Sequence, residues 1–145
     1  MSWRRSCWRR RRPHLNVLHQ AARGARAGSY RDCIGLTLGL MGDRTVVPFL
    51  INYAADETNP PNLRERAIRA LGECPDARAI PVLATALSDP YYVYLQDRMV
   101  YVIRVTARSS LLRLKAAGIA LPADVEHALA QVVTWEQLPP DAVIP

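Results

Sequence analysis

The sequence predicts an all-α fold, an α-α solenoid of about three helical hairpins with atypical ends. Two observations support this class. In residues 63–87, apolar residues recur at helical spacing on both sides of a break at Cys74-Pro75-Asp76, a pattern typical of a helix, a tight turn and a second helix. The same stretch also matches the residues 33 positions before it, and a period of this length is typical of stacked helical repeats.

Three copies of the repeat are present, and the middle one is the best preserved. In the first and second copies, Leu38, Gly39, Asp43, Val47, Pro48, Leu50 and Asp56 correspond to Leu71, Gly72, Asp76, Ile80, Pro81, Leu83 and Asp89. The third copy follows at a distance of 40, so that Arg104, Ala107 and Leu111 correspond to Arg64, Ala67 and Leu71. Seven residues, about two helical turns, are therefore inserted after Pro90. Because a two-helix unit cannot bury its apolar face alone, we expect the copies to stack around one core.

Residues 1–13 form an arginine-rich head, which we expect to be disordered in isolation because its charges repel one another. Nine arginines and one acid precede Cys33, whereas the rest of the chain has ten basic and twelve acidic residues. Four interpretations stay open: a solvated tail or start-site artefact, a nucleic-acid-binding arm, a contact with anionic membranes, and an organellar transit peptide. In the second, phosphates are bound by Arg4, Arg5, Arg9, Arg10, Arg11 and Arg12.

The repeat domain is expected to cover residues 14–133, followed by a proline-containing irregular tail at 134–145. Residues 14–27 predict a short helix that caps the first repeat, and residues 30–41 and 45–55 predict the next two helices. Asp43 and Asp76 are expected to cap the helices that follow them, and Pro48 and Pro81 fall in the first turn of those helices. Residues 56–62 read as a loop.

The inserted segment lies within residues 91–117, which contain neither proline nor glycine. We expect one long helix there, or two helices with an irregular joint. Gly118 is expected to end the helical stretch, and Asp124 to cap a last helix within residues 121–133. The four tyrosines of the insertion cannot all point one way, so at least two of them should pack in the core. These are Tyr91, Tyr92, Tyr94 and Tyr101.

The middle copy resembles HEAT repeats, in particular the short HEAT-like repeats also found in phycobilisome lyases. The residues that carry the resemblance are Leu63-Arg64, Ala67, Ala70-Leu71-Gly72, Asp76, Ile80-Pro81, Leu83 and Asp89. The resemblance implies a right-handed superhelix of antiparallel helix pairs, in which the second helix of each pair lines a concave surface. It also implies contacts between aspartate and arginine within and between repeats, a structural ladder of Arg31, Asp56, Arg64, Asp89 and Arg104.

Function is less constrained than fold. The leading hypothesis is a non-enzymatic module that binds a protein partner along the concave helical surface, because the fold does not require the arginines and tyrosines there and such residues suit an interface. The predicted partner-binding residues are Arg66, Arg69, Tyr94, Arg98, Tyr101 and Arg108. The alternative for the same residues is a solvated helix face.

Catalytic and metal-binding signatures are absent from the sequence, which therefore predicts no enzyme, no cofactor and no metal site. Cys7, Cys33 and Cys74 form no CxxC pair, so we expect Cys33 and Cys74 to be buried thiols in a reducing compartment, the cytoplasm. A lyase-like protein that handles a bilin or another cofactor stays a third hypothesis, because phycobilisome lyases use this repeat.

Overall fold

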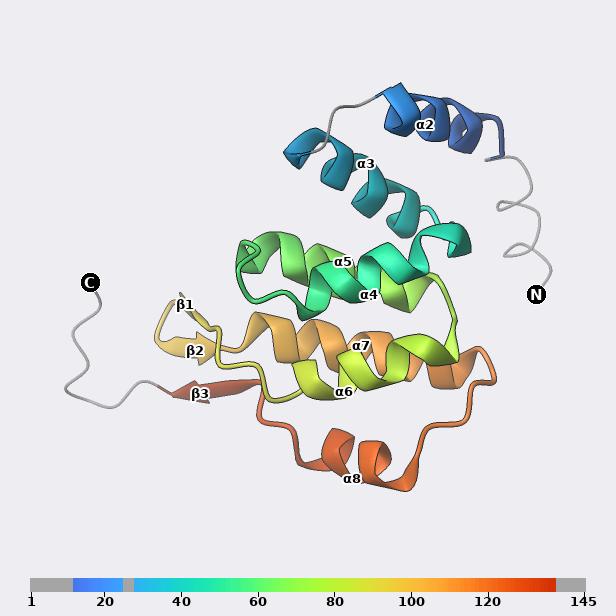
Figure 1. Ribbon diagram of the computed structural model, residues 1–145. Helices are drawn as coiled ribbons and strands as arrows, with labels where there is room; N and C mark the ends of the chain where they lie inside the picture. Colours follow the sequence, from blue (N-terminus) through green and yellow to red (C-terminus); the bar gives the residue numbers. More distant parts are fainter. Residues whose placement is uncertain (1–11, 25–27, 138–145) are drawn as a thin grey trace.

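The computed structural model describes residues 12–24 and 28–137 (Figure 1). In chain order its elements are α2 (Arg12–Gly24), α3 (Ser29–Leu40), the 3-10 helix η1 (Arg44–Val46), α4 (Val47–Ala55), α5 (Pro61–Glu73), the 3-10 helix η2 (Ala77–Ala79), α6 (Ile80–Ala86), β1 (Val93–Leu95), β2 (Arg98–Val100), α7 (Val102–Ala116), α8 (Ala123–Gln131) and β3 (Trp135–Gln137). Most of the described chain is helical, which confirms the predicted class.

The helices form hairpins that stack side by side. Within the hairpins α2 packs on α3, α4 on α5 and α6 on α7. We call α3, α5 and α7 the second helices; α5 packs against both α3 and α7, so that these three form one layer. The first helices α4 and α6 form the other layer, and α8 lies at the far end of the stack (Figure 1). The predicted solenoid of about three hairpins is therefore confirmed.

The turns between units use the aspartates expected from the sequence. Asp43 Oδ1 accepts a hydrogen bond from the backbone N–H of Thr45 at 3.0 Å. Asp76 Oδ1 accepts one from the N–H of Arg78 at 2.9 Å. Both aspartates precede a short 3-10 helix that leads into the first helix of the next unit. Because the two turns share this geometry, successive units are joined in the same way.

One hydrophobic core runs through the stack. Its fully buried members include Leu50 of α4, Leu71 of α5 and Leu111 of α7. Small residues let the second helices approach closely: a Cβ added to Gly39 would lie 2.9 Å from Cβ of Ala70. A Cβ on Gly72 would lie 2.7 Å from Ser110 Oγ and 3.0 Å from Ser110 Cα. Glycine is required at these two crossings.

The helical prediction for residues 91–101 is wrong. The insertion forms the antiparallel hairpin β1–β2, and β3 pairs with β2 to complete a three-stranded sheet, which also replaces part of the expected irregular tail. The physical reason is long-range pairing, because Val100 lies opposite Trp135 and the backbone N–H of Tyr101 donates to the carbonyl of Thr134 at 2.8 Å. The sheet lies at the side of the stack, next to the start of α7 (Figure 1).

Three smaller expectations also fail. Cys33 is exposed, while Cys74 is fully buried as predicted. None of the four tyrosines of the insertion belongs to the buried core, because the sheet carries them away from it. Helix α8 begins one residue before Asp124, so that this aspartate lies in the first turn and Pro122 holds the capping position without a side-chain bond.

The described ranges differ slightly from the expected domain limits. Helix α2 begins at Arg12, inside the predicted head, and residues 1–11 lie outside the described part of the chain. Within residues 12–24 and 28–137, no helix combines the length and apolar character that crossing a membrane requires.

Candidate partner-binding surface

One side of α5 is exposed to solvent, and it indicates which side of the second helices a partner could reach. Helices α3, α4 and α7 pack around it, and its buried residues face them. Asn62, Arg66 and Arg69, at spacings of four and three, are exposed and form one stripe along the remaining side. On α7 the same side carries Ser109 and Arg113, both exposed. We call these five residues the free face.

A buried carboxylate supports the free face. Glu65 is 8% exposed, and its Oε1 accepts hydrogen bonds from Arg69 Nη2 at 2.6 Å and from Thr106 Oγ1 at 2.8 Å. Thr106 comes from α7, so this network joins two second helices. The Arg69 side chain is nevertheless 57% exposed. Arg69 therefore neutralises a buried charge and presents part of its guanidinium to solvent.

The other two arginines of the free face differ in their partners. Arg113 of α7 pairs with Glu73 of α5, and its side chain is 53% exposed. Arg66 is exposed, and within the described part of the chain it forms no ion pair. Arg66 thus offers a positive charge without an ion-pair partner among the described residues, one turn before Arg69 on α5.

Arg108, which the sequence placed on the same surface, lies on another side of α7. The copies on α5 and α7 are offset by 40, so each residue of α5 has an equivalent on α7. On α5, the residues that face α7 are Glu65, Ile68 and Gly72. Their equivalents are Val105, Arg108 and Leu112, all exposed. These side chains therefore point away from α5, out of the end of the stack.

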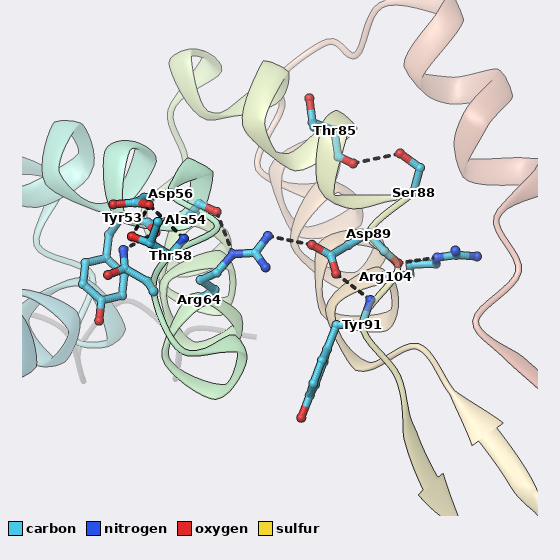
Figure 2. A network of polar contacts seen from close by, with 11 residues as sticks. Tyr53, Ala54, Asp56, Thr58, Arg64, Thr85, Ser88, Asp89, Tyr91 and Arg104 are labelled. Carbon is cyan, nitrogen blue, oxygen red and sulfur yellow. Dashed lines mark hydrogen bonds and ion pairs between the residues drawn. The ribbon is translucent and has the colours of Figure 1, made fainter.

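The predicted ladder is formed around Arg64. Its Nη2 lies 2.6 Å from Asp89 Oδ2, and its Nε donates to the carbonyl of Ala54 at 3.3 Å. Figure 2 shows this side chain extending between the end of α4 and Asp89. Arg104 continues the chain of contacts, because its Nε donates to the carbonyl of Asp89 at 2.8 Å. Asp89 Oδ1 also accepts the N–H of Tyr91 at 2.9 Å, at the start of the insertion.

The two remaining ladder residues take no part in these contacts. Asp56 Oδ1 accepts hydrogen bonds from the side chain and backbone of Thr58 at 2.6 and 2.9 Å, and these bonds lower the pKa of Asp56 below 3.8. Arg31 is exposed and forms no ion pair with any described residue. The polar ladder therefore joins the second and third copies of the repeat.

Aromatic and cationic side chains meet at the sheet. The ring of Tyr92 lies 5.4 Å from that of Tyr94 and 6.0 Å from that of Tyr101, edge to face in both pairs. Arg98 lies over the ring of Trp135, with its guanidinium carbon 4.7 Å from the ring centre. Of the predicted residues, Tyr94 and Tyr101 thus meet through Tyr92, whereas Arg98 contacts Trp135.

A mainly apolar cavity of about 450 Å³ lies between α2, α3 and α4, lined by His19, Leu38 and Phe49 among others. Desolvation raises the pKa of the Cys74 thiol to about 11, so this buried thiol stays protonated at neutral pH. Among residues 12–24 and 28–137, no three histidine, cysteine or acidic side chains come together as metal ligands do.

The antiparallel hairpins, the shared turns and the continuous layer of second helices define the class of the protein: it is an α-solenoid. A family model described as HEAT repeats matches residues 15–103, more than half of the chain. The chain belongs to the HEAT-repeat family. HEAT repeats generally mediate protein–protein interactions, and the family is typically a non-enzymatic scaffold. No curated protein and no solved structure matches the chain.

Proposed function

We propose that this protein is a non-enzymatic interaction module that binds a protein partner through the free face of its second helices. The observation that carries the proposal is the exposure of Arg66, without an ion-pair partner among the described residues, on the same face as the half-exposed arginines Arg69 and Arg113. Helices α5 and α7 pack through their other sides, so the exposed parts of these arginines are available for recognition.

Two of the arginines are already held in position. Arg69 is fixed by Glu65, and Arg113 by Glu73, before any partner arrives. Ordering a long side chain at an interface costs about 0.5–1.5 kcal/mol, and pre-organisation reduces that cost. Arginine is also enriched among residues that dominate binding energy. A partner segment with carboxylates or backbone carbonyls on its surface would suit this row of donors.

The test is recovery of partners by the tagged full chain from cells that express it. Arg66→Glu reverses the free charge and should reduce recovery of the specific partner at least severalfold. Arg23→Glu makes the same charge change on exposed α2 and is the matched control. Melting temperatures of both variants should stay near that of the wild type, because neither arginine holds a buried group. Equal recovery with Arg66→Glu would remove the free face from the interface.

Arg69→Glu is a poorer test, for a structural reason. The new carboxylate would lie beside buried Glu65, whose charge Arg69 now compensates. Breaking a buried ion pair commonly costs about 3–5 kcal/mol, and the exposed side of Arg69 brings the expected cost to the lower end or below. Loss of binding in that variant would not separate a binding defect from unfolding. Arg66 avoids this ambiguity.

Nucleic-acid binding and bilin handling rest on sequence patterns alone. Residues 4, 5, 9, 10 and 11 lie outside the described part of the chain, and the Arg12 side chain is likewise not described. The prediction stays testable: retention of the full chain on a polyanion column should fall steeply with salt and disappear when residues 1–13 are deleted. A spectral change on mixing with a bilin would test the lyase-like alternative.

A further inference from the structure

One side of α7 has the residue spacing of a helix-packing seam, and the described part of the chain leaves its two apolar residues exposed. Tyr101, Val105, Arg108, Leu112 and Lys115 follow one another at spacings of four, three, four and three, which places them in one stripe. Val105 is 39% exposed and Leu112 is 43% exposed. We call this stripe the end face.

The residues of α5 that lie 40 positions before the end face show what normally packs at these positions. The matching positions on α5 form the surface against which α7 packs, where Ser110 Oγ donates to the carbonyl of Ile68 at 2.8 Å and Ser110 fills the space over Gly72. The end face of α7 is thus the place where the next second helix of the array would lie. An exposed apolar stripe in that place is a surface of the kind that another helix covers elsewhere in the stack.

The described chain does not supply that helix. After α7 comes α8, which buries Val125 and lies at the far end of the stack, and the chain then returns to the sheet as β3 (Figure 1). The exposure of Val105 and Leu112 shows that α8 leaves the apolar part of the end face uncovered, while Glu126 of α8 reaches Lys115 at its edge. The last unit of the described chain therefore consists of a first helix without a second.

The central residue of the end face determines the chemistry of what can cover it. In the preceding copy the equivalent of Arg108 is Ile68, whose side chain is fully buried and whose backbone carbonyl accepts a hydrogen bond from Ser110 of α7. Within the described residues Arg108 forms no ion pair, whereas Lys115 at the edge of the stripe is paired with Glu126 at 2.6 Å. Covering Arg108 with an apolar helix would bury an uncompensated charge, which is costly. An occupant with a carboxylate at this position avoids the cost.

We infer that the end face binds one amphipathic helix of a partner protein, packed beside α7 as the next second helix of the stack. The helix carries an aspartate or glutamate opposite Arg108, with apolar residues opposite Val105 and Leu112. A second copy of this chain is disfavoured as the occupant, because two α7 helices related by a two-fold axis through the stripe bring their Arg108 side chains together. The end face shares no residue with the free face, so this inference does not depend on the proposed function.

The experiment uses a displayed library of random peptides as long as α7, 15 residues, selected on the full chain. Enriched peptides are synthesised, and their affinities are measured by fluorescence polarisation against the wild type and three variants. Arg108→Glu reverses the central charge, and Leu112→Ser removes an apolar contact. Arg66→Glu makes the same charge change on the free face and is the matched control. Circular dichroism melts check that each variant is folded, which is expected because all three residues are exposed.

The inference predicts acidic amphipathic peptides whose affinity falls about tenfold or more with Arg108→Glu, falls with Leu112→Ser, and is unchanged with Arg66→Glu. Repeating the selection on Arg108→Glu should yield peptides with lysine or arginine at the central position. Enriched peptides that are insensitive to Arg108→Glu, or no enrichment of helical peptides, would overturn the inference. A concentration-dependent dimer of the chain that Leu112→Ser dissociates would overturn it as well, in favour of a second copy.

Discussion

Arg64 Nη2 lies 2.6 Å from Asp89 Oδ2, and the two side chains are only 11% and 7% exposed. Arg64 belongs to α5, and Asp89 follows α6, so the pair ties a second helix to the start of the insertion. The backbone carbonyl of Ala54 and the N–H of Tyr91 complete the polar surroundings. This ion pair therefore fixes the point at which the regular repeat gives way to the sheet (Figure 2).

Arg64→Ala should lower the free energy of unfolding by about 3 kcal/mol, because it leaves Asp89 buried without its cation. Arg31→Ala, at the equivalent position of the first copy, is the matched control and should change stability by less than about 0.5 kcal/mol, since Arg31 is exposed. Urea unfolding followed by circular dichroism measures both. Similar losses in the two variants would contradict the structural role given to the pair.

Gly72→Ala should destabilise the stack by about 1–3 kcal/mol, because the added methyl group overlaps the side chain and backbone of Ser110. Gly24→Ala, where the added carbon meets no atom within 4 Å, should be neutral or slightly stabilising. Thermal unfolding of the two variants distinguishes the sites. A tolerated Gly72→Ala would show that α5 and α7 are farther apart than the structure places them.

Acid should weaken the contact between His19 of α2 and Asp43, the residue that caps η1. Burial raises the pKa of Asp43, but hydrogen bonds from Thr45 and His19 outweigh this effect and hold the pKa below 3.8. A carboxyl with a lowered folded pKa stabilises the protein fully above its unfolded pKa and loses that contribution as the pH falls through the folded value.

The corresponding variant is Asp43→Asn, expected to cost about 1 kcal/mol at pH 7 through loss of the charged cap. The difference in unfolding free energy between wild type and variant should shrink as the pH is lowered from about 5 to about 2. Urea titrations at several pH values give this difference directly. If the difference in unfolding free energy stays constant over that range, ionised Asp43 is not the cause of the difference.

Gln96→Gly should stabilise the β1–β2 hairpin by about 1 kcal/mol, because Gln96 has a φ of 58°, where a residue with a side chain is strained. Hydrogen exchange of the β1 and β2 amides should slow about fivefold for such a change. Asp97→Gly is the control at the neighbouring turn position, whose φ is not positive. It should speed exchange, and equal effects of the two glycines would argue against this turn geometry.

The repeat made the helical part of the fold predictable. Coincidences between copies located the hairpins, and the local chemistry of Asp43 and Asp76 located the turns, because a cap depends on neighbours within three residues. The HEAT resemblance predicted contacts between aspartate and arginine in general, and the structure shows which residues pair, Arg64 with Asp89. These features depend either on short-range contacts or on equivalence with another copy, both of which a single sequence contains.

The sheet could not be predicted in the same way. Its strands have three residues each, and β2 is completed by β3, which follows α7 and α8 in the chain. The turn at Gln96-Asp97 lacks the glycine or asparagine that marks a tight hairpin. For the candidate site, spacing correctly showed that Arg66 and Arg69 share a side of α5, but the separation of Arg108 from them appears only once the register of α5 against α7 is known.

Site-specific photo-crosslinking in cells tests most directly whether a protein partner lies against the second helices. A photoreactive amino acid replaces exposed Asn62 on the free face, which leaves Arg66 in place, or exposed Thr85 on α6 as the control. A discrete crosslinked protein is expected from position 62, and none of that size from position 85. Crosslinks of equal yield from both positions, or none from position 62, would contradict binding through the free face.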